Sequence, residues 1–63
     1  MIYVDVVSVT PITHKPIITT REFPYKESAL RFMFMIRNKG YIIDGWRCDD
    51  PLDNEWLNHR FKL

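Results

Sequence analysis

The chain has 63 residues, of which 46% are hydrophobic and 27% charged, with a formal net charge of +1. The composition is typical of a globular protein, and the length allows one domain spanning residues 1–63. A net charge this small excludes a strong overall attraction to nucleic acid or to a membrane surface. Because so short a chain rarely builds a pocket that excludes water, we expect that it is not an enzyme.

The single cysteine, Cys48, excludes an internal disulfide and a cysteine-based zinc site within one chain. Small secreted domains usually carry disulfides, so we expect a cytoplasmic protein in which Cys48 is a buried small hydrophobe. The first ten residues include Asp5 and have no basic leader, which argues against a signal peptide. No apolar run approaches the ~18 residues of a membrane span.

Residues 2–9 and 17–23 are rich in β-branched residues and predict two strands of a hairpin. On the first strand Ile2, Val4 and Val6 share one face, and Val7 and Val9 lie on the other. The connecting loop, residues 11–16, begins and ends with proline, and we expect it to expose His14 and Lys15.

A helix is predicted for residues 25–39, after Pro24 and before Gly40, which can form a left-handed C-terminal cap. Its apolar stripe, with Leu30 at the edge, faces the sheet and consists of Ala29, Phe32, Met33 and Ile36. Residues 41–48 predict a third strand with a bulge at Gly45, or alternatively a short hairpin at Asp44-Gly45.

The C-terminal segment contains signals for two structures. Asp50 as N-cap, Pro51 at the first helical position and Asp53 in the first turn predict a helix with Leu52, Trp56 and Leu63 on one face. The alternation of apolar residues over 57–63 suits a fourth strand instead. We favour the helix because capping is the more specific signal.

These elements predict an α+β fold. A small single-layer antiparallel sheet, made of the N-terminal hairpin and a third strand, packs against one central helix and is followed by the C-terminal helix. The alternative with a fourth strand has the element order ββαββ.

Two residues on the central helix, Phe34 and Met35, fall outside its apolar stripe. Either a second layer, formed by the C-terminal segment, covers them, or they form an exposed patch that binds a partner. The candidate contact patch, which we call the central-helix patch, consists of Arg31, Phe34, Met35 and Asn38, since aromatic residues, Met and Arg are enriched in interfaces. The acidic residues 49–55 form a rim that steers the partner electrostatically.

Strand aromatics beside Arg suggest a second class of function, binding of single-stranded nucleic acid. The residues for base stacking are Tyr41, Trp46 and Arg47. Tyr41 and Arg47 share a strand face, and Trp46 joins that face only if the bulge changes the alternation. The alternative role of Trp46 and Trp56 is to anchor the core.

We expect no metal, no cofactor and no catalytic residue. The acidic segment 49–55 lacks the mid-loop glycine of a calcium loop, and His14 and His59 do not have a metal-ligand spacing. Cys48, Ser8 and Ser28 lie in no sequence signature of an activated nucleophile.

With its dense aromatic residues and no catalytic motif, the chain is similar in general type to small accessory proteins of bacteriophages. That resemblance implies a protein that binds and redirects a host protein in the host cytoplasm. Our interpretation is a non-enzymatic interaction protein that acts as an inhibitor or regulator, with homodimer formation through the same patch as the nearest variant.

Overall fold

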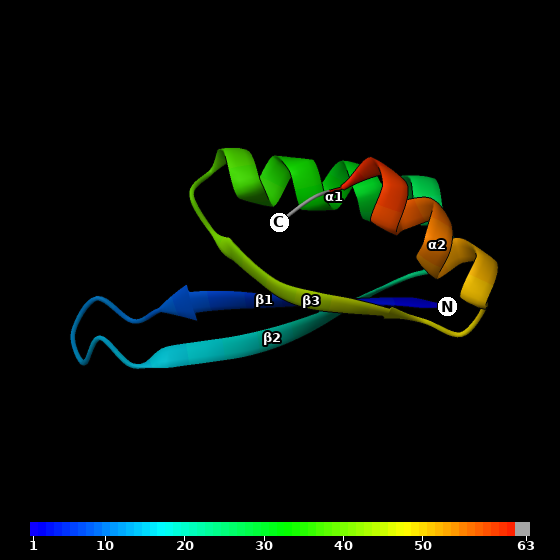
Figure 1. Cartoon of the computed structure of the whole chain (residues 1–63). Coiled ribbons are helices and arrows are strands. Elements are labelled where there is room, and N and C mark those ends of the chain that lie inside the picture. Colours follow the sequence, from blue (N-terminus) through cyan, green and yellow to red (C-terminus); the bar gives the residue numbers. More distant parts are fainter. Residues whose placement is uncertain (62–63) are drawn as a thin grey trace.

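The computed structural model of the chain describes residues 1–61, and Figure 1 shows their arrangement. The elements in chain order are β1 (Ile2–Val9), β2 (Pro16–Phe23), α1 (Lys26–Asn38), β3 (Ile42–Cys48) and α2 (Pro51–Arg60). The three strands form an open antiparallel sheet in the order β2-β1-β3. The predicted α+β fold is confirmed, and residues 51–60 form the helix rather than the alternative fourth strand.

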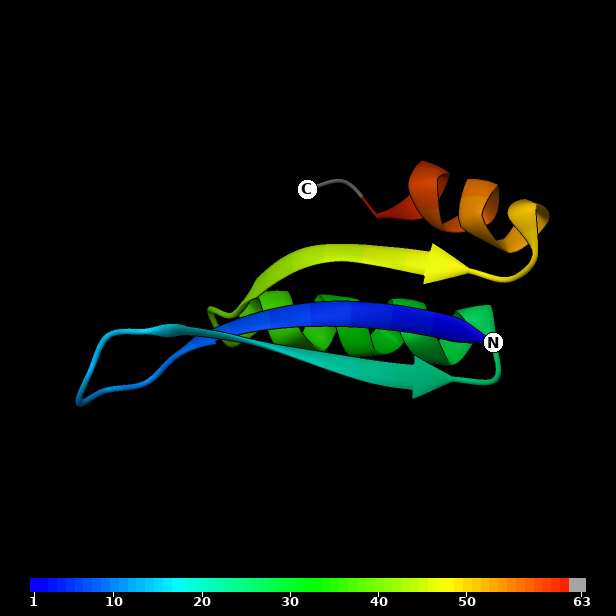
Figure 2. The same cartoon turned by 90° about the horizontal axis from the view of Figure 1, so that it is seen from below.

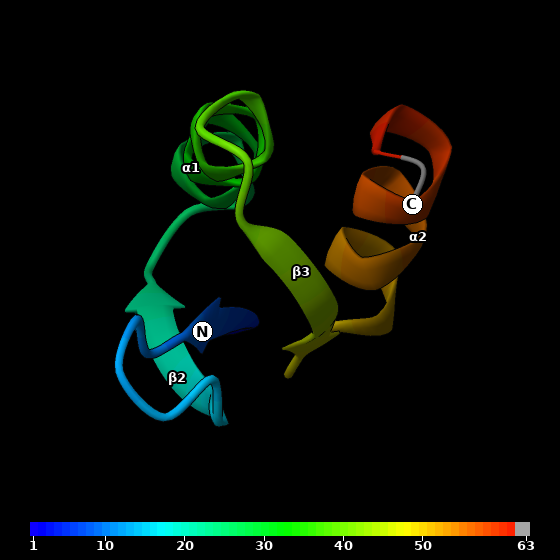
Figure 3. The same ribbon diagram turned by 90° about the vertical axis from the view of Figure 1, so that its left-hand side faces the viewer.

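Both helices lie on the same side of the sheet (Figure 3). The side chains of Ile2, Val4 and Val6 on β1 point towards this side and are buried. Seen from below, the three strands lie in front of α1, and α2 lies beyond β3 (Figure 2). We call the surface opposite the helices the open face. No helix within residues 1–61 has the length and apolar character to cross a membrane.

The buried face of α1 and its C-terminal end are explained by the residues within and just after the helix. Ala29 and Met33 are fully buried against the sheet, as the predicted stripe requires. The helix ends in a Schellman motif, because the Gly40 N–H donates to the Arg37 carbonyl at 3.0 Å and the Tyr41 N–H to the Ile36 carbonyl at 3.1 Å. Gly40 has φ +90, the left-handed conformation that glycine adopts without a Cβ penalty.

The strand β3 is continuous and contains the predicted bulge. Asp5 of β1 pairs with Gly45, but Val6 pairs with Ile43, so Asp44 is the extra residue. The bulge changes the alternation, and as a result Ile43 and Trp46 both face the helices although their numbers differ in parity.

The helix α2 begins as predicted, since the Asp50 carboxylate accepts the Leu52 N–H at 2.9 Å. Its docking face agrees with the prediction only at Trp56, which is half-buried against the core. Leu57 is the buried residue, followed by Phe61 just after the helix, whereas Leu52 is 71% exposed. The reason is that α2 packs against β3 and α1 through the face containing residues 57 and 61. Leu63, the third predicted member of the face, lies outside the described residues.

Candidate protein-binding surface

The central-helix patch is more polar in the structure than its composition suggests. Arg31, Met35 and Asn38 are spaced at i, i+4 and i+7 and are exposed, Met35 by 46%. Phe34 is half-buried, because its ring packs edge-on against Phe61 with the centroids 5.2 Å apart. All four residues therefore lie on α1, but the aromatic one, Phe34, packs against the C-terminal segment.

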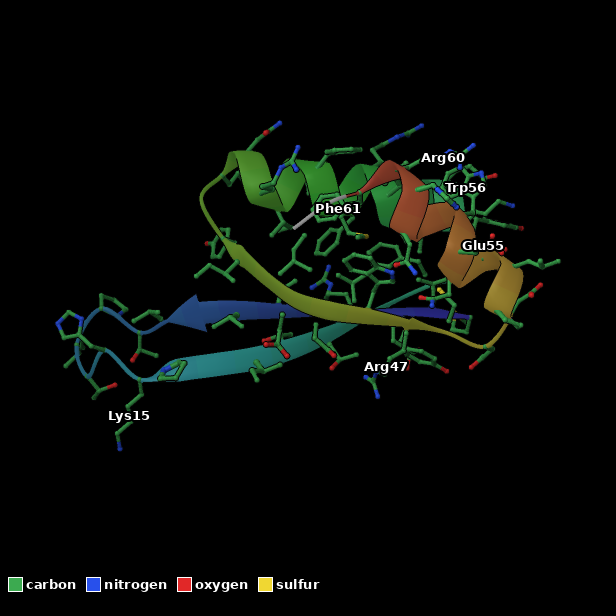
Figure 4. The ribbon with its side chains drawn as sticks, in the orientation of Figure 1. Lys15, Arg47, Glu55, Trp56, Arg60 and Phe61 are labelled. Atoms are coloured by element: carbon green, nitrogen blue, oxygen red, sulfur yellow. The ribbon has the colours of Figure 1, made fainter. Side chains whose placement is uncertain are left out.

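The three residues proposed for base stacking lie on two faces of the sheet. Trp46 points towards the helices, where its ring meets Phe61 at 5.7 Å. Arg47 points to the open face, away from both helices (Figure 4). Tyr41 precedes β3 and lines a groove under α1. The three residues therefore do not form one continuous platform for base stacking.

The open face carries a group of exposed aliphatic side chains that no helix covers. Val7 pairs directly with Ile18 of β2 and with Ile42 of β3, so the three side chains form a row across the sheet. Ile18 is 59% exposed and Ile42 64%. Val9, two residues farther along β1 on the same face, is 57% exposed. We call these four residues the aliphatic patch.

The other half of the open face is polar and internally hydrogen-bonded. The Thr20 hydroxyl donates to the Asp5 carboxylate at 2.6 Å, and Arg47 Nη2 lies 3.4 Å from the same Asp5 oxygen. The Arg47 guanidinium also lies over the Tyr3 ring, 5.6 Å from its centroid. The open face thus combines an apolar half with a half in which Tyr and Arg are held in place.

The hairpin extends beyond α1 because the helix is shorter than the strands. Thirteen residues give a helix of about 20 Å, whereas the eight residues of β1 extend for about 27 Å. The hairpin therefore protrudes past the end of α1 (Figure 1). The radius of gyration is 12.1 Å, compared with about 11 Å for a compact chain of this length.

On the helix side, a groove of about 270 Å³ opens between α1 and the distal half of the sheet. Its walls are Phe32 and Ile36 from α1, Val6 and Ser8 from β1, Thr19 and Arg21 from β2, and Tyr41. Arg21 lies over the Phe32 ring, with 5.7 Å between the guanidinium and the ring centroid. The groove is mostly apolar and adjoins the outer edge of β2.

The aliphatic patch was not predicted from the sequence, although two signals pointed to it. Ile17 and Ile18 are adjacent, so one of them must lie on each face of β2. The alternation also weakens at Val7 and Val9 of β1. What was lacking is the strand order, because only that order shows that Ile18 and Ile42 flank Val7.

The thiol of Cys48 is half-buried on the helix side of β3. Burial raises its pKa above the ordinary value of a cysteine, and the nearby carboxylate of Asp53 raises it further. The thiol is therefore protonated at neutral pH, and its reactivity as a nucleophile is low. Within residues 1–61, no three His, Cys, Asp or Glu side chains are grouped as metal ligands.

In the acidic rim predicted at residues 49–55, the three aspartate carboxylates interact with groups of the same chain. The Asp49 carboxylate lies 3.2 Å from the N-terminal amine of Met1. Asp50 caps α2, and Asp53 lies 3.9 Å from Lys26 of α1. These carboxylates hold Met1 and α2 in place, at the opposite end of the molecule from the hairpin loop.

Comparison of the chain with protein-family models, with curated proteins and with solved structures finds no match.

Proposed function

We propose that this chain is a small non-enzymatic interaction protein that binds a protein partner through the open face of its sheet and acts as an inhibitor or regulator. The observation that carries the proposal is the aliphatic patch, three of whose four side chains are more than half exposed. Leaving such side chains in water has a cost, since complete burial of one Val or Ile contributes about 1.5–3 kcal/mol.

The surroundings of the patch favour a protein partner. Protein interfaces combine an apolar centre with a polar rim, and they are enriched in Tyr and Arg. Here Tyr3 and Arg47 lie on the polar half of the same face, separated from the aliphatic patch by the row that contains Asp5. Arg47 is already positioned by Asp5, so less side-chain entropy is lost when a partner binds.

The proposal also includes the cellular compartment and the type of protein. A single half-buried cysteine suits the reducing cytoplasm, and a chain of this size suits an accessory protein that occupies a surface on a larger protein. The central-helix patch is the alternative contact surface, with Met35 as its exposed apolar member.

The test is affinity capture from a cytoplasmic extract with the wild type and two variants. Val9→Asp/Ile42→Asp places charges in the aliphatic patch, on β1 and β3, and leaves β2 unchanged. Met35→Asp places one charge on the exposed side of α1 and serves as the matched control. We expect the wild type and Met35→Asp to retain the same protein, and Val9→Asp/Ile42→Asp to lose it.

Retention of the same protein by all three chains would contradict the proposed surface. Loss with Met35→Asp alone would transfer the function to the central-helix patch. Far-UV circular dichroism and urea midpoints verify folding, and Ile42→Thr gives a variant that keeps the β-branched side chain while removing apolar area.

A further inference from the structure

The outer edge of β2 is unpaired among the described residues. Within residues 16–23 all side chains are exposed except that of Phe23, which is half-buried. An unpaired edge strand presents a row of free N–H and C=O groups to any other strand, and proteins usually protect such edges. A proline, Pro16, stands at one end of β2, and the strand carries one cation and one anion, Arg21 and Glu22.

The hydrogen-bond pattern shows which backbone groups point outwards. The Thr10 N–H donates to the Lys15 carbonyl at 3.3 Å, so this pair, which continues the β1–β2 register, is a hydrogen-bonded one. Because such pairs alternate in an antiparallel ladder, the odd-numbered residues of β2 bond to β1. The N–H and C=O groups of Ile18, Thr20 and Glu22 therefore point away from the sheet.

We propose that two copies of this chain form a homodimer by antiparallel pairing of their β2 edges, giving a six-stranded sheet. A two-fold axis perpendicular to the sheet makes β2 complementary to itself and keeps all four helices on one side. Pairing centred on Thr20 gives partners to the outward N–H and C=O groups of Ile18, Thr20 and Glu22. Pairing centred on Thr19 does the same except for the Glu22 carbonyl, which then faces Pro16, a residue without an N–H. Neither arrangement places like charges opposite each other within β2.

The groove under α1 gives this pairing a second contact. Ile17 lies on the helix side of β2 and is 47% exposed. In the dimer, Ile17 of the second copy lies opposite Arg21 when the axis passes Thr19, or opposite Phe23 when it passes Thr20. Both Arg21 and Phe23 contact the Phe32 ring, the latter with centroids 4.9 Å apart. The second copy's Ile17 therefore packs beside Arg21 at the mouth of the groove in the first arrangement, and beside Phe23 in the second.

The area of a standard interface can be compared with the surface of one chain. A standard interface covers about 800 Å² per partner, which is about one sixth of the 4661 Å² surface of this chain. β2 offers a strip about 27 Å long together with the groove beside it. A dimer would also join the two open faces into one larger surface, but the pairing itself does not depend on the proposed function.

The test is the molar mass in solution, measured by light scattering or sedimentation equilibrium as a function of concentration. We expect the wild type to approach twice 7.6 kDa as its concentration rises. Thr19→Lys adds a positive charge that faces its own symmetry mate when the axis passes Thr19, or Arg21 of the second copy when it passes Thr20. We expect it to weaken dimerisation ~10-fold or more, since opposed like charges disfavour association.

Asn58→Lys is the matched control, because it adds the same charge at an exposed position of α2. We expect it to dimerise like the wild type. Adding Arg21→Glu to Thr19→Lys restores dimerisation fully if the axis passes Thr20, and partly if it passes Thr19. A wild type that stays at 7.6 kDa up to about 1 mM overturns the proposal, as does equal dimerisation of Thr19→Lys and the wild type.

The two proposals fail in different ways. Val9→Asp/Ile42→Asp leaves the β2 edge unchanged, so its molar mass should equal that of the wild type while protein capture is lost. Thr19→Lys leaves the aliphatic patch unchanged. A variant that loses capture of the protein partner but keeps the molar mass of the wild type therefore tests only the open face. A variant that no longer forms the dimer tests only the β2 edge.

Discussion

The ring of Phe61 lies between Phe34 of α1 and Trp46 of β3, with centroid distances of 5.2 and 5.7 Å. The Arg37 guanidinium lies 4.9 Å from the centroids of both phenylalanine rings. Edge-on aromatic pairs contribute about 0.5–1.5 kcal/mol beyond the area they bury. Phe34 is thus part of a cluster that joins three parts of the chain, which is why most of its apolar surface is unavailable to a partner.

Two leucines on α2 provide a test of this packing at the scale of a single residue. Leu57 is fully buried and Leu52 is 71% exposed, so the same substitution has very different consequences at the two positions. We expect Leu57→Ala to lower the free energy of unfolding by about 2–5 kcal/mol, because it leaves a cavity. Leu52→Ala should change it by no more than ~0.5 kcal/mol. Urea denaturation followed by circular dichroism measures both values.

The size of the expected loss matters for a chain this short. Total stabilities of about 0.05–0.15 kcal/mol per residue give roughly 3–9 kcal/mol for 63 residues. Leu57→Ala should therefore lose a large part of the total stability, which lowers its urea midpoint far more than Leu52→Ala does. Equal effects of the two substitutions would show that α2 does not dock through Leu57.

At the scale of elements, the sequence predicts best what local chemistry determines. The end of α1 depends on Gly40 and the start of α2 on Asp50 and Pro51, and both are where the sequence placed them. The docking face of α2 was predicted only in part, because it depends on how the helix packs against β3 and α1 and not on its local sequence alone. The aliphatic patch was missed for the same reason, since it requires the strand order and the side of the sheet on which both helices pack.

Substitution of the two glycines distinguishes the effect of an unusual backbone conformation from the effect of a crowded site. At neither glycine does an atom from beyond the two neighbouring residues lie within 4 Å of the position where a Cβ would be, but Gly40 has φ +90 and Gly45 does not have a positive φ. We expect Gly40→Ala to destabilise the protein by about 1–2 kcal/mol through left-handed backbone strain. Gly45→Ala should leave stability unchanged within ~0.5 kcal/mol.

Thermal or urea unfolding of both variants under identical conditions gives the comparison. Gly40→Asn should recover part of the loss, because asparagine tolerates the left-handed region better than alanine does. A loss at Gly45 as large as that at Gly40 would mean that the bulge of β3, and not the cap of α1, is the sensitive feature.

The whole molecule is a one-sided structure. Both helices and the buried side chains of β1 lie on one side of the sheet, and the aliphatic patch lies on the other (Figures 1 and 3). The two edges of the sheet also differ. β3 has α2 beside it, whereas β2 has no further strand or helix along its outer edge within residues 1–61 (Figure 2). The outer edge of β2 is thus the place where a strand of a second copy can extend the sheet.

Amide hydrogen exchange should reveal this asymmetry. β1 is paired on both sides, so we expect its amides to be the most protected in the sheet. In dilute solution, alternate amides of β2 should differ sharply. The N–H groups of Thr19 and Arg21 bond to β1 and exchange slowly, whereas those of Ile18 and Thr20 point to water and exchange fast. Two-dimensional NMR after transfer to D₂O measures each rate.

The same exchange rates, measured at increasing protein concentration, test whether the β2 edge pairs with a second copy. Pairing of two β2 edges would bury the N–H groups of Ile18, Thr20 and Glu22, so their exchange should slow as the concentration rises while that of β1 stays constant. Thr19→Lys should abolish this dependence. Strong protection of Thr20 in dilute solution would contradict the free edge, because it would require a partner for that N–H within a single chain.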